Sequence, residues 1–322
     1  MKISIIIPIY KAEKWIGRCL DSIFSQSVSE RDFEVLCVVD GSPDKSLEIL
    51  ETYKMTHENL IIINQDNQGV SAARNHGIEQ SSGDYLLFVD SDDILLDNSL
   101  GLIFKTIDNG ISEVVVCRAF INENEWQPWC GLFNDKEIVS SEEAIRRGFL
   151  HGSVWGCYYN SSFIKKNNIR FPQGVSNGED NFFFISCLYY ANYIRFEDIE
   201  LYRVIEESNS LSRTFDIVRL DRVVQSLEIM DSLIKNYSII NSKYYILNYI
   251  RYTCLSGLVA TVQNTEGVGY GYLRKNRVYK YAHFNMDKKL TYLRKNMKLM
   301  RFSFMLFYYL SWIKHSVMKN SI

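Results

Sequence analysis

Three aspartates lie within four positions directly after an apolar run. The segment FVDSDDIL (88–95) contains Asp90, Asp92 and Asp93. Like charges held this close repel one another, and burial removes the water that would screen the repulsion. A divalent cation that prefers oxygen ligands, Mg²⁺ or Mn²⁺, would offset that cost and commonly links protein carboxylates to phosphates. The cluster therefore predicts a metal and diphosphate site. The alternative is an acidic loop that caps the helix expected near 97–109.

A second acidic pair, Glu179 and Asp180, follows Gly174 and Gly178 and precedes the aromatic run FFFISCLYY. One carboxylate is enough to take the proton from an attacking hydroxyl group, and partial burial beside a second carboxylate would raise the basicity of Asp180. Acids are also favourable at a helix N-terminus for electrostatic reasons. The pattern by itself leaves a catalytic base and helix capping equally open.

The first 120 residues alternate strand and helix patterns, and this alternation predicts how the acids are positioned. Strands are expected at 3–9, 33–40, 60–64, 84–90 and 113–119, and helices at 13–24, from Ser42 (N-cap) and Pro43 onward, and at 70–81. Repeated β-α units predict an α/β fold with a Rossmann-like, doubly wound, mostly parallel sheet flanked by helices. Such sheets bind ligands beyond the carboxyl ends of their strands, where Asp40 and the acidic cluster would lie.

The chain contains no glycine-rich phosphate loop of the GxGxxG or GxxxxGK[ST] type. A bound diphosphate would therefore be neutralised by metal and side chains. Arg74, on the helix expected before the fourth strand, is the candidate cation. An exposed helix arginine with no such role is the equal alternative.

Three segments, IIIPIYKAEKWIGRCLDSIFSQ, VVDGSPDKS and NQGVSAARNHGIEQSSGDYLLFVDSDD, resemble in order and spacing the inverting glycosyltransferases of family two, which have the GT-A fold. The block WGCYYNSSFIKKNNIRFPQGVSNGEDNFFF (155–184) extends the resemblance to the acceptor side of the bacterial surface-polysaccharide enzymes. The last hundred residues resemble nothing that can be placed.

The resemblance implies roles for the residues around the nucleotide. Pro8 and Tyr10 would line its pocket, with the ring of Tyr10 packed on the base, and Asp40 would hydrogen-bond a uracil. Glu13 and Ser91 are assigned to the same nucleotide-sugar pocket.

The resemblance also implies roles around the reacting bond. Asp92 would be the principal metal ligand, and Asp90 would meet the metal or the ribose. Arg74 would contact the phosphates. Asp180 would be the general base, with Glu179 beside it.

The predicted reaction is transfer of a hexosyl or N-acetylhexosaminyl group from a nucleotide sugar, UDP-linked, to a glycan or a lipid-linked saccharide, with Mn²⁺ or Mg²⁺ as cofactor. The predicted domains are a catalytic GT-A domain at 1–215, with a nucleotide-sugar half (1–95) and an acceptor half (96–215), and a helical C-terminal region at 216–322. A sugar nucleotidyltransferase is one alternative, although PIYKAEKW lacks the glycine-rich loop of that class. An inactive scaffold that binds nucleotide sugar is the other.

Charge is unevenly distributed along the 322 residues. The segment 273–322 contains twelve Lys and Arg and one Asp, a net charge of +11 in a chain whose formal net charge is −2. Together with the aromatic stretch RFSFMLFYYLSWIKHSVMK (301–319), this predicts a basic anchor at a membrane surface. A core helix or a dimer contact is the alternative for this segment. RNA is disfavoured, and no nucleic-acid partner is expected, because no RNA-binding module is recognisable.

The seven cysteines are scattered and show no metal-ligand spacing, which predicts reduced, mostly buried thiols. The beginning MKISIIIPIYK has too short an apolar run for a signal peptide, and no segment reaches the roughly 20 apolar residues that span a bilayer. The expected location is the cytoplasm, with peripheral attachment to the cytoplasmic face of the membrane.

Overall fold

The computed structural model describes most of the chain. The described residues are 2–106, 112–122, 124–126, 132–149, 152–175, 178–205, 217–235, 247–282, 298–300, 303–305 and 307–311. All structural statements below concern these residues. Two regions of interest fall outside them, namely the predicted polar break at 236–243 and most of the basic segment after residue 282.

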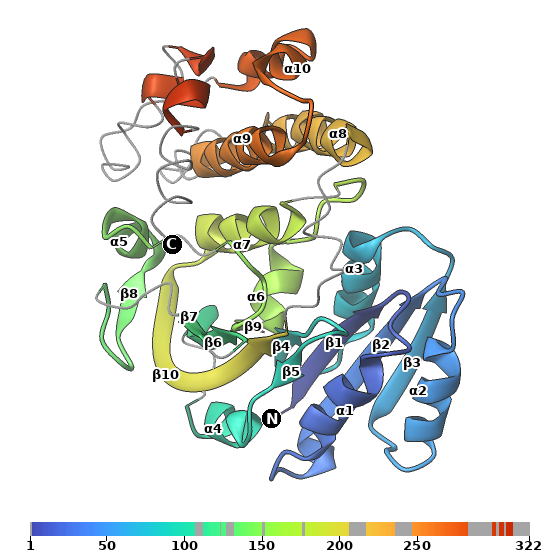
Figure 1. Cartoon of the computed structure of the whole chain (residues 1–322). Helices are drawn as coiled ribbons and strands as arrows, with labels where there is room; N and C mark the ends of the chain where they lie inside the picture. Colours follow the sequence, from blue (N-terminus) through green and yellow to red (C-terminus); the bar gives the residue numbers. More distant parts are fainter. Residues whose placement is uncertain are drawn as a thin grey trace.

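The N-terminal half is a parallel sheet with helices on both faces (Figure 1). Its strands lie in the spatial order β3-β2-β1-β4. The strands are β1 (Ile3–Ile9), β2 (Phe33–Asp40), β3 (Leu60–Gln65) and β4 (Tyr85–Phe88), and the helices are α1 (Ile16–Phe24), α2 (Ser46–Lys54) and α3 (Val70–Gln80), with a short 3-10 turn η1 (Glu30–Asp32). The predicted β-α alternation of this half is confirmed.

The second half makes the sheet mixed. β9 lies between β4 and β6 and runs antiparallel to both, whereas β6 and β10 are parallel. The elements are β5 (Ile94–Leu95), α4 (Ser99–Thr106), β6 (Val114–Ile121), β7 (Asn124–Trp126), β8 (Ile138–Ser140), α5 (Ser141–Arg146), β9 (Cys157–Asn160), α6 (Ser161–Lys166), α7 (Glu179–Tyr190) and β10 (Tyr193–Val204). β10 is a long curved strand that pairs with β6, β8 and β5 (Figure 1). The pairing of β9 with β4 joins the two halves of the sheet.

Apolar side chains cover both faces of the sheet. The face under α1 and α4 buries residues such as Ile5, Leu20 and Ile103, and the opposite face buries Phe88, Phe171 and Phe183. The ring of Phe171 stacks on that of Phe183 at 4.0 Å, and Phe88 meets both rings edge-on. The strands β1 and β2 are buried along almost their whole length, which explains their nearly continuous apolar sequence.

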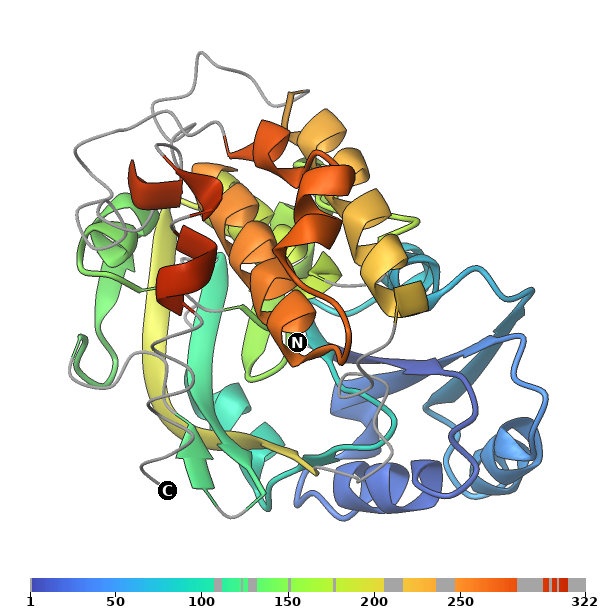
Figure 2. The same ribbon diagram turned by 45° about the horizontal axis from the view of Figure 1, so that its top comes forward.

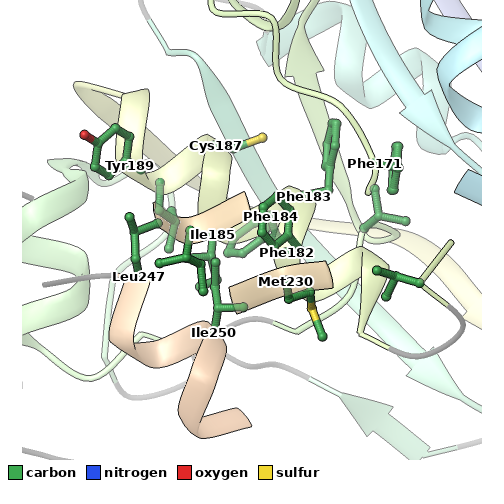
Figure 3. Packing of buried hydrophobic residues seen from close by; sticks show 14 of the residues in the cluster. Phe171, Phe182, Phe183, Phe184, Ile185, Cys187, Tyr189, Met230, Leu247 and Ile250 are labelled. Carbon is green, nitrogen blue, oxygen red and sulfur yellow. The ribbon is translucent and has the colours of Figure 1, made fainter. Parts of the chain in front are cut away.

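The C-terminal helices complete the second core. They are α8 (Ile217–Lys235), α9 (Leu247–Asn264), α10 (Tyr270–Lys275) and the 3-10 turn η4 (Val278–Tyr281). Figures 1 and 2 show α8 and α9 lying over α7. Figure 3 shows Met230, Leu247 and Ile250 turned toward the aromatic helix α7, whose residues belong to the same buried cluster. The C-terminal helices therefore share a core with the sheet.

The predicted start of the second helix is wrong. Helix α2 begins at Ser46, not at Pro43. The hydroxyl of Ser42 instead accepts the backbone N–H of Lys11 and donates to Asp44, and Asp44 accepts the backbone N–H of Ser46. The N-cap position is therefore occupied by Lys45, whose side chain makes no capping hydrogen bond, and Asp44 satisfies the N–H of the first helical residue instead.

Within the described part of the aromatic segment 301–319, some side chains are buried and others exposed. Phe304, Phe307 and Tyr308 are each 7% exposed, and the carbonyl of Tyr308 accepts a hydrogen bond from Gln263 of α9. Met305, Tyr309 and Leu310 are about half exposed. This segment packs on α9 through one face and presents apolar side chains on the other. In the part of the chain that the structure describes, no helix is both long enough and apolar enough to span a bilayer.

The predicted state of the cysteines is confirmed where it can be seen. Six cysteines lie in described segments, none of them in a disulfide, and five of these are buried. Of these six described cysteines, only Cys254 is partly accessible.

Candidate active site

The predicted donor-side acids lie at one edge of the sheet. Asp40 ends β2, and Asp90 follows the last residue of β4 by two positions. The strands β2, β1 and β4 are adjacent and parallel, so their carboxyl ends share this edge. The predicted convergence of Asp40 with the acidic cluster at a single edge is therefore observed.

Arg74 joins the donor-side acids to the acceptor-side pair. Its guanidinium donates from Nη2 to Asp90 at 2.7 Å and from Nη1 to Asp180 at 2.5 Å, and Glu179 lies 3.9 Å away. The side chain of Arg74 is only 3% exposed and stacks over Phe171 at 5.1 Å. The alternative of an exposed helix arginine is excluded. One cation here holds together carboxylates that are 90 positions apart in the sequence.

The segment after β9 is anchored to α3 by the residue next to Arg74. Asn75 donates from its amide to the carbonyl of Phe171 at 2.8 Å and accepts the backbone N–H of Phe171 at 2.9 Å. A buried amide that satisfies both backbone polar groups of one residue fixes the relative position of two chain segments. Asn75 therefore supports the face on which Arg74 stacks. Sequence analysis missed this residue because nothing in ARN distinguishes it from a solvated polar position.

Glu179 and Asp180 open helix α7, as expected. They are 17% and 20% exposed, and Gly178 precedes them in a left-handed conformation with φ 90°. Burial raises the pKa of Asp180 to about 7, against the opposing effect of the Arg74 charge, and burial likewise raises the pKa of Glu179. A carboxylate with a pKa near neutrality is suited to accept and release a proton near pH 7.

The acidic cluster divides into residues with different environments. Asp93 points inward and is 4% exposed, where it accepts the Tyr202 hydroxyl at 2.7 Å and the backbone N–H of Ile205 at 2.8 Å. The same hydroxyl accepts the backbone N–H of Asp90. Burial, with a contribution from the charge of Asp90, raises the pKa of Asp93 to about 8. Asp93 is thus a structural link to β10, which leaves Asp90 and Asp92 as the acids at the open edge.

Tyr202 was not singled out from the sequence. It lies in β10, a strand that no predicted element covers, and its ring stacks on Trp155 at 5.4 Å. The sequence IRFEDIELYRV alternates apolar and polar residues, which is the pattern of a strand with one buried face. That partial alternation was the available signal for β10. It gave no signal for Tyr202, which is buried directly after the equally buried Leu201 and so breaks the alternation.

The carboxylate of Asp40 is held by the loop that leads into α3. It accepts the backbone N–H groups of Gln68 and Gly69 and the side-chain amide of Gln65, each at 2.8 Å, and it is 3% exposed. A carboxylate offers about four acceptor positions, so one remains for a further donor. Contact with a uracil stays a prediction.

The remaining nucleotide-side residues occupy the same edge. Pro8 is half-buried in β1, and the ring of Tyr10 is 44% exposed with the Lys11 ammonium 5.3 Å from its centre. Ser91 is half-buried between Asp90 and Asp92. Packing of the exposed Tyr10 ring on a nucleotide base stays a prediction. Glu13 is directed to the start of α2, where it accepts the backbone N–H of Lys45 at 3.1 Å.

A divalent cation fits the residues at this edge. The described residues contain no group of three or more His, Cys, Asp or Glu arranged to hold a metal. Mg²⁺ and Mn²⁺ in phosphate-binding sites commonly need only one or two carboxylates, because substrate phosphates and water supply the other oxygens. Asp92 is half-buried at the open edge beside Asp90, and Asp90 uses one oxygen for Arg74. The two acids can hold a cation only together with a ligand that brings its own oxygens.

The chain was compared with known families and proteins. The model of glycosyl transferase family 2 matches residues 4–167. A poly(ribitol-phosphate) beta-glucosyltransferase of Bacillus spizizenii is 33% identical over 189 residues, which cover 57% of this chain and 29% of that protein. The uncharacterised glycosyltransferase EpsJ of Bacillus subtilis is 29% identical over 217 residues, 65% of this chain and 62% of that protein. The aligned part is less than two thirds of the length of these relatives.

Solved structures show the same architecture. Residues 1–349 of TarS from Staphylococcus aureus, in complex with UDP-GlcNAc, superpose with a TM-score of 0.68 at 22% identity, covering 94% of this chain and 87% of that one. A mannosyltransferase of Pyrobaculum calidifontis in complex with GDP-Man and Mn²⁺ superposes with a TM-score of 0.57 at 14% identity, covering 97% and 87%. These likenesses confirm the predicted GT-A fold.

Proposed function

Because this chain belongs to glycosyl transferase family 2, we propose that it moves a sugar from a UDP-sugar to an acceptor hydroxyl with inversion at the anomeric carbon. The observation that carries the proposal is the bridge formed by Arg74, which holds Asp180 and Asp90 on its two terminal nitrogens. This bridge places a carboxylate of raised pKa beside the edge where a diphosphate would bind. The TarS structures with UDP-GlcNAc and UDP, and the relatives named as glucosyl- and N-acetylglucosaminyltransferases, support a UDP-linked hexose or N-acetylhexosamine.

In the proposed reaction, Asp180 takes the proton of the acceptor hydroxyl while the oxygen attacks the anomeric carbon. The new carbon–oxygen bond forms as the bond from that carbon to the diphosphate breaks, and its electron pair stays with the departing UDP. One carboxylate suffices, because a single displacement needs only one proton acceptor. Glu179 and Asp90 keep the surroundings of Asp180 negative, which favours transfer of the proton to it.

A bound Mn²⁺ or Mg²⁺ would neutralise the diphosphate charge, with Asp92 and Asp90 as its protein ligands. Arg74 lies at the same edge of the sheet, where its guanidinium orients the carboxylate of Asp90. The Mn²⁺ complex of the Pyrobaculum mannosyltransferase supports a metal in this fold. Cell-surface polysaccharide synthesis is the proposed context, supported by the cell-wall polymer in the names of two relatives.

The activity test measures which product leaves the donor. The protein is incubated with Mn²⁺ and either a panel of UDP- and GDP-sugars or, in a parallel reaction, UTP with sugar 1-phosphates, and release of nucleoside diphosphate and of pyrophosphate is followed separately. We expect UDP release, with a loss of about 10²-fold or more in Asp180→Asn while UDP binding is retained. The control is Glu58→Gln, which removes an exposed carboxylate. Pyrophosphate release would indicate a sugar nucleotidyltransferase, and full activity of Asp180→Asn would refute the assignment of the base.

We also propose that the basic C-terminal region contacts an anionic membrane surface at the cytoplasmic face. The net charge of +11 after residue 272 and the half-exposed side chains of Met305, Tyr309 and Leu310 support this. Leu310→Glu is expected to weaken sedimentation with vesicles that contain anionic lipid at low salt, whereas Met55→Glu, which changes a residue that is 80% exposed in the N-terminal half, is not. Equal sedimentation of the wild type with neutral vesicles would contradict the electrostatic part of the proposal.

A further inference from the structure

A cavity of about 270 Å³ opens beside the proposed general base. Most of its lining residues come from the N-terminus of α7 and from the C-terminal helices α8 and α9. Figure 1 shows α8 and α9 on the side of α7 away from the sheet. Pockets for drug-sized ligands occupy about 300–1,000 Å³, so this cavity is sized for a single small unit. Neither the sequence patterns nor the donor site assign a role to it.

One part of the cavity wall carries hydrogen-bond acceptors. Glu179 and Asp180 line it, and so does Asn181, whose Oδ1 atom is buried and has no hydrogen-bond partner. A buried polar atom without a partner costs free energy, which a ligand that donates to it would recover. The ligand is therefore expected to present hydroxyl groups to this part of the wall.

Another part of the wall is apolar. It is formed by Val223, Leu227 and Met230 of α8 and by Cys254 of α9. Such a wall suits the C–H face of a sugar ring, which is apolar although the ring edge carries hydroxyl groups. Figure 3 shows Met230 held against the aromatic residues of α7, so the wall is a fixed part of the core.

The charges around the cavity disfavour an anion. Among the described residues that line it there is no Lys or Arg, and two of them are acidic. The neighbouring cation, Arg74, is buried and already faces Asp90, Glu179 and Asp180. A phosphate or carboxylate placed here would meet like charges without compensation.

We infer that this cavity binds one neutral, hydroxyl-rich sugar unit of the acceptor, with its hydroxyl groups toward Asp180 and Asn181 and its C–H face on Leu227 and Met230. The inference rests on the proposed function, since it identifies the substrate that Asp180 would deprotonate. Any charged group of the acceptor then lies outside the cavity.

Gly257 offers a variant that fills the cavity and leaves the fold intact. It lines the cavity from within α9, and a Cβ atom built on it meets no other atom within 4 Å. Replacing a helix-interior glycine also improves helix propensity by up to about 1 kcal/mol. Gly257→Leu is therefore expected to occupy the space without unfolding the protein. The matched control is Gly271→Leu in α10, where a Cβ atom is equally unobstructed and no wall of the cavity is touched.

The test measures direct binding, so it does not require turnover. The probes are the p-nitrophenyl β-glycosides of glucose, galactose and N-acetylglucosamine, and their 6-phosphates, titrated by ligand-observed NMR in the presence of UDP and Mn²⁺. We expect at least one neutral glycoside to bind wild type and Gly271→Leu within twofold of each other, and Gly257→Leu at least tenfold more weakly. The 6-phosphate of that sugar should bind wild type at least tenfold more weakly than the neutral form.

Three results would overturn the inference: no neutral glycoside binds, Gly257→Leu binds like wild type, or the phosphorylated glycoside binds as well as the neutral one. Binding of UDP is recorded for each variant and should be unchanged. Failure of the wild type to bind UDP would contradict the proposed function, and the glycoside titrations would still decide the role of the cavity.

Discussion

Arg74 is the residue on which the electrostatics of the site depend. Its single positive charge faces three carboxylates, of which Asp90 and Asp180 accept hydrogen bonds from different nitrogens. Removal of one partner from a buried ionic group costs about 3–5 kcal/mol, because the remaining charges stay buried without compensation. Lysine cannot replace this geometry, since it carries one compact charge and no planar fork.

We therefore expect Arg74→Met to lower the free energy of unfolding by about 3 kcal/mol or more and Arg74→Lys to recover only part of it. In Arg74→Lys the pKa of Asp180 should be higher than in the wild type, which moves the acidic limb of the activity profile to higher pH. Urea denaturation and the pH dependence of kcat/KM measure the two effects. An Arg74→Lys enzyme with the stability and pH profile of the wild type would show that the bridge has no energetic role.

Asp180 sets the pH dependence expected of the reaction. Its pKa of about 7 means that the carboxylate form, which alone accepts a proton, increases as pH rises through neutrality. The rate of sugar transfer should accordingly rise about tenfold per pH unit below pH 7 and level off above it. A rate that is constant from pH 5 to pH 8 would contradict the role of this group as the base.

The raised pKa of Asp93 implies that its contribution to stability falls as pH rises. An Asp in a salt bridge shows the opposite dependence. In the unfolded chain it ionises near 3.8, whereas its pKa in the folded protein is about 8. Its contribution to stability is full below pH 3.8 and is lost progressively as pH rises to about 8. The free energy of unfolding of Asp93→Asn, minus that of the wild type, should therefore increase by about 1–3 kcal/mol as the pH is raised from 5 to 8.5. Urea denaturation in EDTA measures this difference. A difference that is independent of pH would contradict the raised pKa.

At the scale of elements, the start of α7 depends on the conformation of Gly178. Its φ of 90° is one that side chains with a Cβ rarely adopt, and a Cβ there would lie 3.4 Å from the sulfur of Cys254. Gly178→Ala is expected to cost about 1–2 kcal/mol and to displace Asp180, which reduces transfer activity. Gly257→Ala, in the interior of α9, should instead be neutral or stabilising. Calorimetry on these two variants tests whether the cost comes from backbone strain at Gly178. If both variants were destabilised, strain at Gly178 would not be the cause.

The sequence predicted the elements whose patterns are local. The first two strands were expected with the bounds that β1 and β2 have, because both faces of these strands are buried and their apolar runs are continuous. β9 and β10 were missed. The residues CYYN of β9 are too few to show a period, and the place of β10 in the sheet depends on its pairing with β6, 80 or more positions earlier in the sequence. The insertion of the antiparallel strand β9 between β4 and β6 has no signature in its local sequence.

The candidate site likewise combines features that local sequence patterns predict with features that depend on the tertiary fold. The acids at the strand ends could be predicted, since their spacing follows directly from the β-α pattern. The bridge from Arg74 to Asp180 could not, because it joins residues 106 positions apart whose distance is set by how the second half folds back. The cavity beside Asp180 was likewise out of reach, since two of its walls come from α8 and α9.

At the scale of the whole molecule, the C-terminal helices α8 and α9 share a buried core with α7. Phe182 and Ile185 of α7 are buried in a cluster that includes Leu227, Met230 and Ile250. A protein ending at residue 216 would expose this apolar face, so we expect it to be insoluble or to bind a hydrophobic dye strongly. The comparison is a protein ending at residue 282, which retains α8 and α9. A soluble, cooperatively folded 1–216 fragment would instead support an independent catalytic domain with a boundary near residue 215.

The antiparallel strand β9 has a consequence for how the protein is made. β4 pairs with β1 on one side and with β9 on the other, and β9 lies about 70 residues further along the chain. On a ribosome that adds about 5–20 residues per second, the edge of β4 that pairs with β9 remains unpaired for roughly 4 to 14 seconds. During that interval an apolar strand edge is open to any other nascent chain nearby. The rate of translation across residues 89–156 should therefore influence how much of this enzyme escapes aggregation.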